Sequence, residues 1–224
     1  MIKFKPFGDS AVLISFSEKI LDTTYNEIVN FCNELRRNKI HGINSLIPAY
    51  NSITVSYNPS EISYDEVLKK MKSIDSQQEI NEKSKIVEIP VCYHKDFALD
   101  MEELMDLTKL SSHEIIAKHT APVYKVYMLG FMPGFCYLGG MDADLIIPRK
   151  KTPRSRIVQG SVGIGGEQTG VYPLDAPGGW QIIGRSPKKF FDKNNIEKPF
   201  LLKQGDQVRF VEISLETFKK MFHD

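Results

Sequence analysis

The sequence is short of cysteine, of net charge and of long apolar runs. Its three cysteines, Cys32, Cys92 and Cys136, are too few and too widely spaced for a disulfide framework or a zinc site, and its five histidines show no HxH or HExxH spacing, so we expect no structural metal. A formal net charge of +1 argues against nucleic acid as a partner. No apolar stretch approaches the ~18 residues that span a bilayer, and the first residues lack the apolar core of a signal peptide. We therefore expect a cytoplasmic protein with no membrane partner.

The length and composition of the chain are typical of a globular protein with two domains. The 224 residues are 42% hydrophobic and 25% charged, enough for two cores. The segment 76–85 is polar and holds a single large apolar residue, which is typical of a linker. We therefore predict an N-terminal domain over 1–79 and a C-terminal domain over 85–224.

The first domain alternates between strand and helix patterns. Apolar residues at every second position predict half-buried strands over 10–16 and 52–57, and helical spacing predicts a helix over 22–38. Ser63 and Glu66 form a capping box, which predicts a further helix. This order favours a small α/β sandwich with its helices on one face of a sheet.

The second domain has many short strand patterns separated by glycine and proline, which predicts a β-barrel or sandwich. The chain as a whole is therefore predicted to be α+β. Two short helices are expected, one capped by Asp100 with Glu103 and one by Ser111 with Glu114, and a closing helix is expected over 214–222. The expected strands cover 86–93, 123–129, 161–164, 180–183 and 207–213.

Glycine and proline are densest over 127–187, where arginines stand beside the turns. Glycine there permits tight turns or close approach to a ligand, and arginine suits planar anions such as carboxylates or phosphates. The glycines near 163–166 are not a Walker loop, because no lysine follows them. They are not a dinucleotide fingerprint either, because Gln168 stands where the third glycine belongs. By composition alone, the basic segment 149–156 is more typical of a solvated loop.

Several motifs occur together in this stretch: GFMPGFCYLGG at 130–140, Pro-Arg pairs at 148–149 and 153–154, GSVGIGGEQTGVYP at 160–173, and PGGWQIIGR at 177–185. Together they resemble the B-type subunit of bacterial 5-oxoprolinase. The same family contains the KipI-type kinase inhibitors and the domain known as allophanate hydrolase subunit 1. The resemblance covers most of the chain and implies a C-terminal cyclophilin-like β-barrel. Cys136 and Gly165 depart from the residues usual in the family, Pro or Ala and Ala respectively.

The resemblance also implies a set of site residues, each with a structural alternative. A lone histidine is more often a core residue, Gln168 and Thr169 also suit turns, and Trp180 and Tyr137 also suit packing. The residues implied to be catalytic are His119, Arg154, Gln168 and Arg185, with a near-neutral pKa expected for His119. The residues implied to bind substrate are Tyr137, Arg149, Thr169, Pro177, Gly178, Gly179 and Trp180.

The implied reaction is the ATP-dependent opening of 5-oxo-L-proline to L-glutamate by a complex with A-type and C-type subunits. ATP and Mg would be bound by the complex, not necessarily by this chain, and the isolated chain would be inactive. The alternative is a KipI-type inhibitor that binds a sporulation-type histidine kinase and blocks its autophosphorylation. These two functions share the motifs, so the sequence does not separate them. A role in allophanate degradation is disfavoured, because the Ser-Ser-Lys amidase signature is missing.

Overall fold

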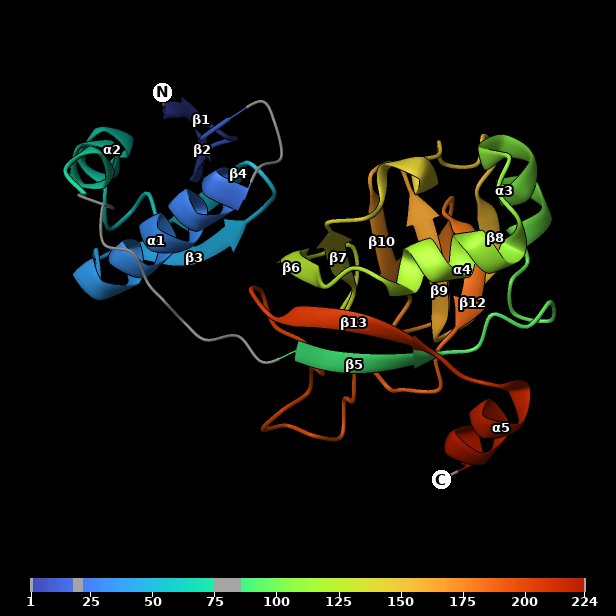
Figure 1. The fold of residues 1–224 in the computed structure, drawn as a ribbon. Coiled ribbons are helices and arrows are strands. Elements are labelled where there is room, and N and C mark those ends of the chain that lie inside the picture. Colours follow the sequence, from blue (N-terminus) through green and yellow to red (C-terminus); the bar gives the residue numbers. More distant parts are fainter. Residues whose placement is uncertain (1, 18–21, 75–85, 224) are drawn as a thin grey trace. The chain divides into compact units, whose positions relative to one another are not determined.

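A computed structural model describes residues 2–17, 22–74 and 86–223, which divide into two compact units, Met1–Lys83 and Ser84–Asp224 (Figure 1). The predicted linker at 76–85 lies outside the described residues. No helix among the described residues is both long and apolar enough to cross a membrane.

The first unit is a four-stranded antiparallel sheet with two helices packed on one core. Its strands lie in the order β1-β2-β4-β3, so β2 and β4 are central, and Val12 pairs with Val55 and Ile14 with Ile53. These side chains share a buried cluster with residues of both helices, which confirms the small α/β sandwich. The elements are β1 (Lys3–Pro6), β2 (Ala11–Ser15), α1 (Asp22–Asn38), β3 (Ile43–Pro48), β4 (Ser52–Tyr57) and α2 (Tyr64–Lys72).

The second unit is a seven-stranded sheet that curves until its two edges meet. The strand order is β12-β9-β10-β7-β6-β13-β5, with β5 and β13 parallel. Directly after β5, the backbone of Cys92 exchanges two hydrogen bonds of 2.8 and 3.0 Å with Arg185 in β12, which closes a nearly complete barrel. The strands are β5 (Ile86–Val91), β6 (Tyr124–Leu129), β7 (Cys136–Gly139), β9 (Ser161–Gly165), β10 (Gln168–Val171), β12 (Gln181–Arg185) and β13 (Gln207–Glu212). A separate pair is formed by β8 (Arg154–Ile157) and β11 (Ala176–Gly178).

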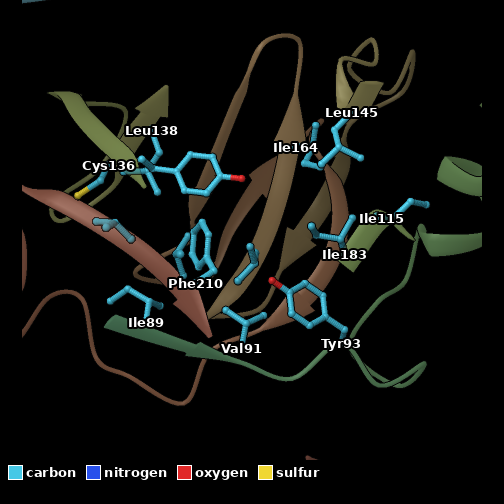
Figure 2. Close-up of a cluster of buried hydrophobic side chains, with 14 of the residues drawn as sticks. Ile89, Val91, Tyr93, Ile115, Cys136, Leu138, Leu145, Ile164, Ile183 and Phe210 are labelled. Atoms are coloured by element: carbon cyan, nitrogen blue, oxygen red, sulfur yellow. The ribbon is translucent and has the colours of Figure 1, made fainter. Parts of the chain in front are cut away.

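The interior of this barrel is filled by aliphatic and aromatic side chains from most of its strands (Figure 2). Val91, Ile164 and Phe210 come from three different strands, and Leu104 and Ile115 enter the same cluster from two helices. The predicted α+β fold with a C-terminal barrel is therefore confirmed. The helical elements of this unit are α3 (Met101–Thr108), α4 (Ser112–Thr120), a short 3-10 helix (Ala143–Leu145) and α5 (Leu215–His223).

Two of the three predicted helix caps are present. At the start of α2, the Ser63 hydroxyl accepts from the Glu66 amide, and the Glu66 carboxylate accepts from the Ser63 amide at 3.0 Å. Ser111 and Glu114 form the same reciprocal pair before α4. Caps of this kind stabilise a helix by about 1 kcal/mol each. The predicted cap at Asp100 is wrong, since its side chain makes no capping hydrogen bond to α3.

Candidate functional site

The glycines of the β9–β10 hairpin make room for the single tryptophan. A Cβ added at Gly165 would lie 2.6 Å from the indole ring of Trp180, and one added at Gly170 would lie 3.2 Å from it. Gly163 approaches the Cβ of Trp180 in the same way, at 3.2 Å. The glycine density of this motif therefore reflects close packing of Trp180 against two strands.

Trp180 belongs to a small aromatic cluster next to the barrel core. Phe135 contacts both Tyr172 and Trp180 edge to face, with ring centroids 5.3 and 5.4 Å apart. Tyr137 packs against the edge of this group, 5.9 Å from Trp180, and is only partly buried. Such edge-to-face pairs hold one another in a defined geometry. These packed rings form an aromatic surface, which we call the floor.

An exposed arginine lies on this floor. The guanidinium of Arg149 lies 5.8 Å from the centre of the Trp180 ring. A cation over an aromatic face is held there electrostatically, while its N–H groups stay available to an anion. Among the described residues no carboxylate forms an ion pair with Arg149. We call Arg149, Tyr137, Tyr172 and Trp180 the Arg149 site.

The positive charge of Arg149 influences the pKa values of Tyr137 and Tyr172. Burial raises the pKa of Tyr172 to about 12, although a hydrogen bond from the Trp180 backbone and the charge of Arg149 act in the opposite direction. Burial also raises the pKa of Tyr137, again against the effect of Arg149. Both phenols are therefore neutral at physiological pH and can donate hydrogen bonds.

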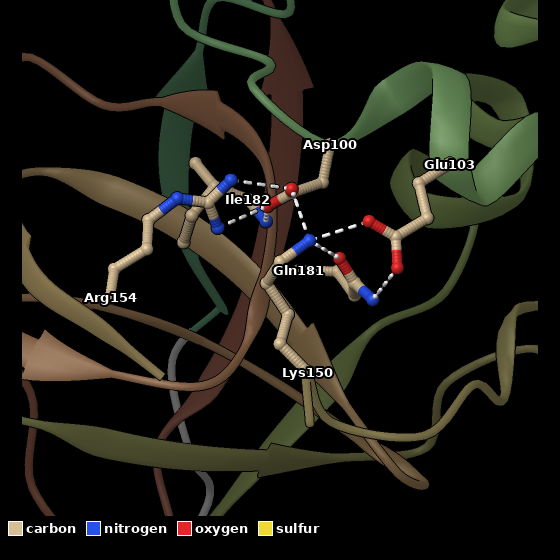
Figure 3. A network of polar contacts seen from close by, with 6 residues as sticks. All are labelled: Asp100, Glu103, Lys150, Arg154, Gln181 and Ile182. Atoms are coloured by element: carbon tan, nitrogen blue, oxygen red, sulfur yellow. Dashed lines mark hydrogen bonds and ion pairs between the residues drawn. The ribbon is translucent and has the colours of Figure 1, made fainter. Parts of the chain in front are cut away.

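Beside the Arg149 site lies a network of charged groups around a buried carboxylate (Figure 3). Asp100 is 4% exposed and accepts two hydrogen bonds from Arg154, at 2.6 and 2.8 Å. It accepts two more, from Lys150 at 2.9 Å and from the backbone amide of Ile182 at 2.6 Å. Burial alone would raise the pKa of Asp100, but these hydrogen bonds and the charge of Arg154 lower it overall. Asp100 is therefore an ionised residue that ties α3 to β8 and β12.

The placement of Arg154 argues against the catalytic role that the resemblance implied for it. Both terminal nitrogens of its guanidinium donate to Asp100, and the side chain is partly buried. A bidentate pair of this kind occupies the face that an anionic ligand would need. Arg154 is therefore a structural partner of Asp100.

His119 lies in the interior, which argues for a structural role and against acid–base catalysis. The Thr169 hydroxyl donates to the carbonyl of Gly163 at 3.0 Å, so its oxygen can only accept from His119 Nε2 at 2.9 Å. The Nδ1 atom then accepts from the Tyr93 hydroxyl at 2.7 Å. Burial lowers the pKa of His119 to about 3, so the near-neutral value expected from the sequence is wrong. Thr169 is likewise fully buried in this chain of hydrogen bonds.

Arg185 is held away from the other two arginines. It ends β12, four residues after Gln181, which corresponds to roughly 13 Å along an extended strand. Its Nε donates to the Gln159 carbonyl at 2.9 Å, and its guanidinium lies 5.0 to 5.8 Å from the rings of Phe97, Phe218 and Phe222. This arginine joins α5 to the barrel and does not reach the Arg149 site.

The remaining predicted residues lie around the Arg149 site or at its border. Gly178 pairs with Arg154 across β11 and β8, and a Cβ added at Gly178 would collide with the Tyr172 hydroxyl. The carbonyl of Gly179 accepts from the Lys150 amide at 2.7 Å. Pro177 is exposed, and Gln168 is partly buried opposite Gly165. The structure thus brings together Tyr137, Arg149, Arg154, Gly178, Gly179 and Trp180.

Sequence reasoning missed several residues of this region. Tyr172 stands inside the quoted motif at 160–173, yet nothing local marks it as part of the floor. Asp100 and Glu103 had the spacing of a helix cap, and Lys150 belonged to a basic run typical of a solvated loop. The hydrogen bonds that join these residues to one another and to Gln181 connect positions about 30 to 80 residues apart, so only the fold reveals them.

An arginine exposed on an aromatic surface can offer its N–H groups to a small anion. The chain belongs to the carboxyltransferase domain family, subdomain C and D, whose model matches residues 2–202. It is 40% identical to the B-type 5-oxoprolinase subunit of Bacillus subtilis (strain 168), over 95% of this chain and 93% of that protein.

Solved structures show the same fold. The crystal structure of TTHA0988 has a TM-score of 0.81 and 34% identity over 96% of this chain, which spans only 41% of that longer protein. The urea carboxylase of Kluyveromyces lactis has a TM-score of 0.83 at 20% identity, covering 100% of this chain and 23% of that one. At that identity the likeness concerns the fold alone.

Proposed function

We propose that this chain is the B-type subunit of a cytoplasmic, ATP-dependent 5-oxoprolinase complex, which opens 5-oxo-L-proline to L-glutamate together with A-type and C-type subunits. The observation that carries the proposal is Arg149, an exposed guanidinium held over Trp180 without an acidic partner among the described residues. The name of the Bacillus subtilis relative supports the assignment.

The Arg149 site suits the charged end of such a substrate. The carboxylate of 5-oxoproline accepts a bidentate pair of hydrogen bonds from a planar guanidinium. The neutral hydroxyl of Tyr137, which is only partly buried and close to Arg149, can donate a further hydrogen bond. In this proposal the chain binds and orients the substrate.

The chemical step needs more than this chain. Opening an unstrained lactam breaks amide resonance, and coupling to ATP hydrolysis supplies the driving force. We assign the use of ATP with Mg to the complex and no residue of this chain to it. The isolated chain is then expected to release no glutamate from 5-oxoproline and ATP.

The test is reconstitution with the A-type and C-type subunits, followed by an assay of glutamate release. Arg149→Ala should remove a charge-assisted contact worth about 1.5–3 kcal/mol, which corresponds to a roughly ten- to hundredfold loss in kcat/KM. Arg149→Lys should recover part of that loss, because lysine keeps the charge but not the planar fork. Lys151→Ala, at the exposed position two residues on, is the matched control and should behave like the wild type.

Two results would overturn the proposal. One is turnover of 5-oxoproline by the isolated chain. The other is a reconstituted complex in which Arg149→Ala and Lys151→Ala are both as active as the wild type. Inhibition of a histidine kinase by the chain, with no turnover in the complex, would favour the KipI-type function instead.

A further inference from the structure

We infer that Lys150 is a positioning residue that holds Arg149 over Trp180, so that the Arg149 guanidinium is set in place by the partly buried network of Lys150 with Asp100 and Glu103. Its importance for substrate binding rests on the proposed function, whereas the geometric relation does not.

Lys150 is attached to both sequence neighbours of Trp180. Its backbone amide donates to the Gly179 carbonyl at 2.7 Å, and its Nζ donates to Gln181 Oε1 at 3.2 Å. Residue 150 therefore lies alongside residues 179–181. The side chain of the preceding residue, Arg149, then meets the tryptophan between those two attachment points.

The attachment of Lys150 is strengthened by two carboxylates. Its Nζ contacts Asp100 Oδ1 at 2.9 Å and also forms an ion pair with Glu103. Glu103 in turn accepts from Gln181 Nε2 at 2.9 Å, which closes a ring of Lys150, Glu103 and Gln181 (Figure 3). The Lys150 side chain is 19% exposed and that of Asp100 is 3% exposed, so water competes little for their contact. The Glu103 side chain is 47% exposed, so its ion pair with Lys150 is more strongly screened.

Neither carboxylate of the network is close to being neutralised at physiological pH. Hydrogen bonds from Lys150 and Gln181 lower the pKa of Glu103, and the pKa of Asp100 is also lowered. Lys150, with its pKa raised by the same two acids despite partial burial, stays charged. The charges of the network are therefore paired with one another, and Arg149, which precedes Lys150, is exposed.

The first experiment reads the geometry without any substrate. Trp180 is the only tryptophan, so fluorescence excited at wavelengths that tyrosine does not absorb, and its quenching by acrylamide, report on this site. Arg149→Ala should raise the quenching constant by uncovering the ring. Lys150→Met should raise it as much, and the double variant should show no further rise. Lys151→Met is the matched control and should match the wild type.

A second variant guards against a folding defect in Lys150→Met. Glu103→Gln weakens the same attachment from a half-exposed position and should shift quenching in the same direction by a smaller amount. Wild-type quenching in both Lys150→Met and Glu103→Gln, alongside a rise in Arg149→Ala, would overturn the inference.

The second experiment uses the reconstituted complex. Lys150→Met should raise the KM for 5-oxoproline about tenfold while kcat changes little, because only the placement of a binding group is lost. Lys150→Arg keeps the charge and should restore part of the affinity. A roughly tenfold fall in kcat with an unchanged KM would contradict a positioning role. If the two single variants and the double variant show the expected quenching but the complex does not turn over 5-oxoproline, the proposed function fails and the positioning role stands.

Discussion

His119 shows how burial changes the chemistry of a single residue. Its ring nitrogens are both used within the barrel, and its ring stacks on Phe210 with centroids 4.5 Å apart. A proton added to Nδ1 would need a new acceptor, because the Tyr93 hydroxyl already donates there. The neutral ring is therefore strongly favoured in the folded state.

This preference predicts a pH-dependent stability. The pKa of His119 is about 3 in the folded protein against 6.5 as the ordinary value, so the unfolded chain binds the extra proton between these pH values. The contribution of neutral His119 to the free energy of unfolding is therefore fully present above pH 6.5, and it is lost as the pH falls toward 3. At pH 5 the loss should be about 2 kcal/mol relative to pH 8.

The measurement is urea unfolding at pH 8 and pH 5, followed by Trp180 fluorescence, which reports on the second unit. His119→Gln should be less stable at pH 8 but should show a smaller difference between the two pH values. His113→Gln, on the exposed side of the same helix, should keep the wild-type difference. Equal pH dependence in all three proteins would contradict the buried neutral histidine.

At the scale of elements, strand β8 carries two arginines with different surroundings. Arg154 pairs with Asp100, whose side chain is 3% exposed, whereas Arg156 pairs with Asp175 where the two side chains are 72% and 44% exposed. Exposed pairs are screened by water and contribute little. A buried carboxylate that loses its bidentate partner keeps its desolvation cost with less compensation, which for Asp100 would come only from Lys150 and the Ile182 amide.

We therefore predict that Arg154→Ala lowers the free energy of unfolding of the second unit by about 3 kcal/mol. Arg156→Ala, two residues along the same strand, should cost less than about 1 kcal/mol. Denaturant unfolding of both variants at neutral pH is the measurement. Similar small losses in both would show that the Asp100 network does not hold β8 to α3.

At the scale of the whole molecule, the chain has separate cores for its two units. One buried cluster joins the sheet and helices of the first unit, and another fills the barrel. No residue that the structure describes belongs to both clusters. Each unit therefore has the apolar interior that independent folding requires.

We predict that limited trypsin digestion cuts first within 76–85, where Lys83 and Lys85 stand in a polar segment. Two fragments that keep their circular dichroism should result, and they can be identified by mass spectrometry. Early cleavage inside 123–187 would count against this division of the chain.

The sequence by itself determined the local structure of this protein. Helix α1 begins and ends at the predicted residues, the caps of α2 and α4 are present, and β4 has the predicted bounds. Such signals act between residues a few positions apart, so they survive without knowledge of the fold. The co-occurring motifs also indicated the family to which the chain belongs.

The tertiary structure alone decided which of the three arginines is available to a ligand. Local sequence placed Arg149, Arg154 and Arg185 alike beside rigid turns. Asp100, 54 positions before Arg154, forms hydrogen bonds with that arginine. The aromatic rings of Phe97 and of α5 surround Arg185. Burial and pairing depend on contacts between distant segments, and no local pattern records them. For that physical reason Arg149 stands out only once the barrel is formed.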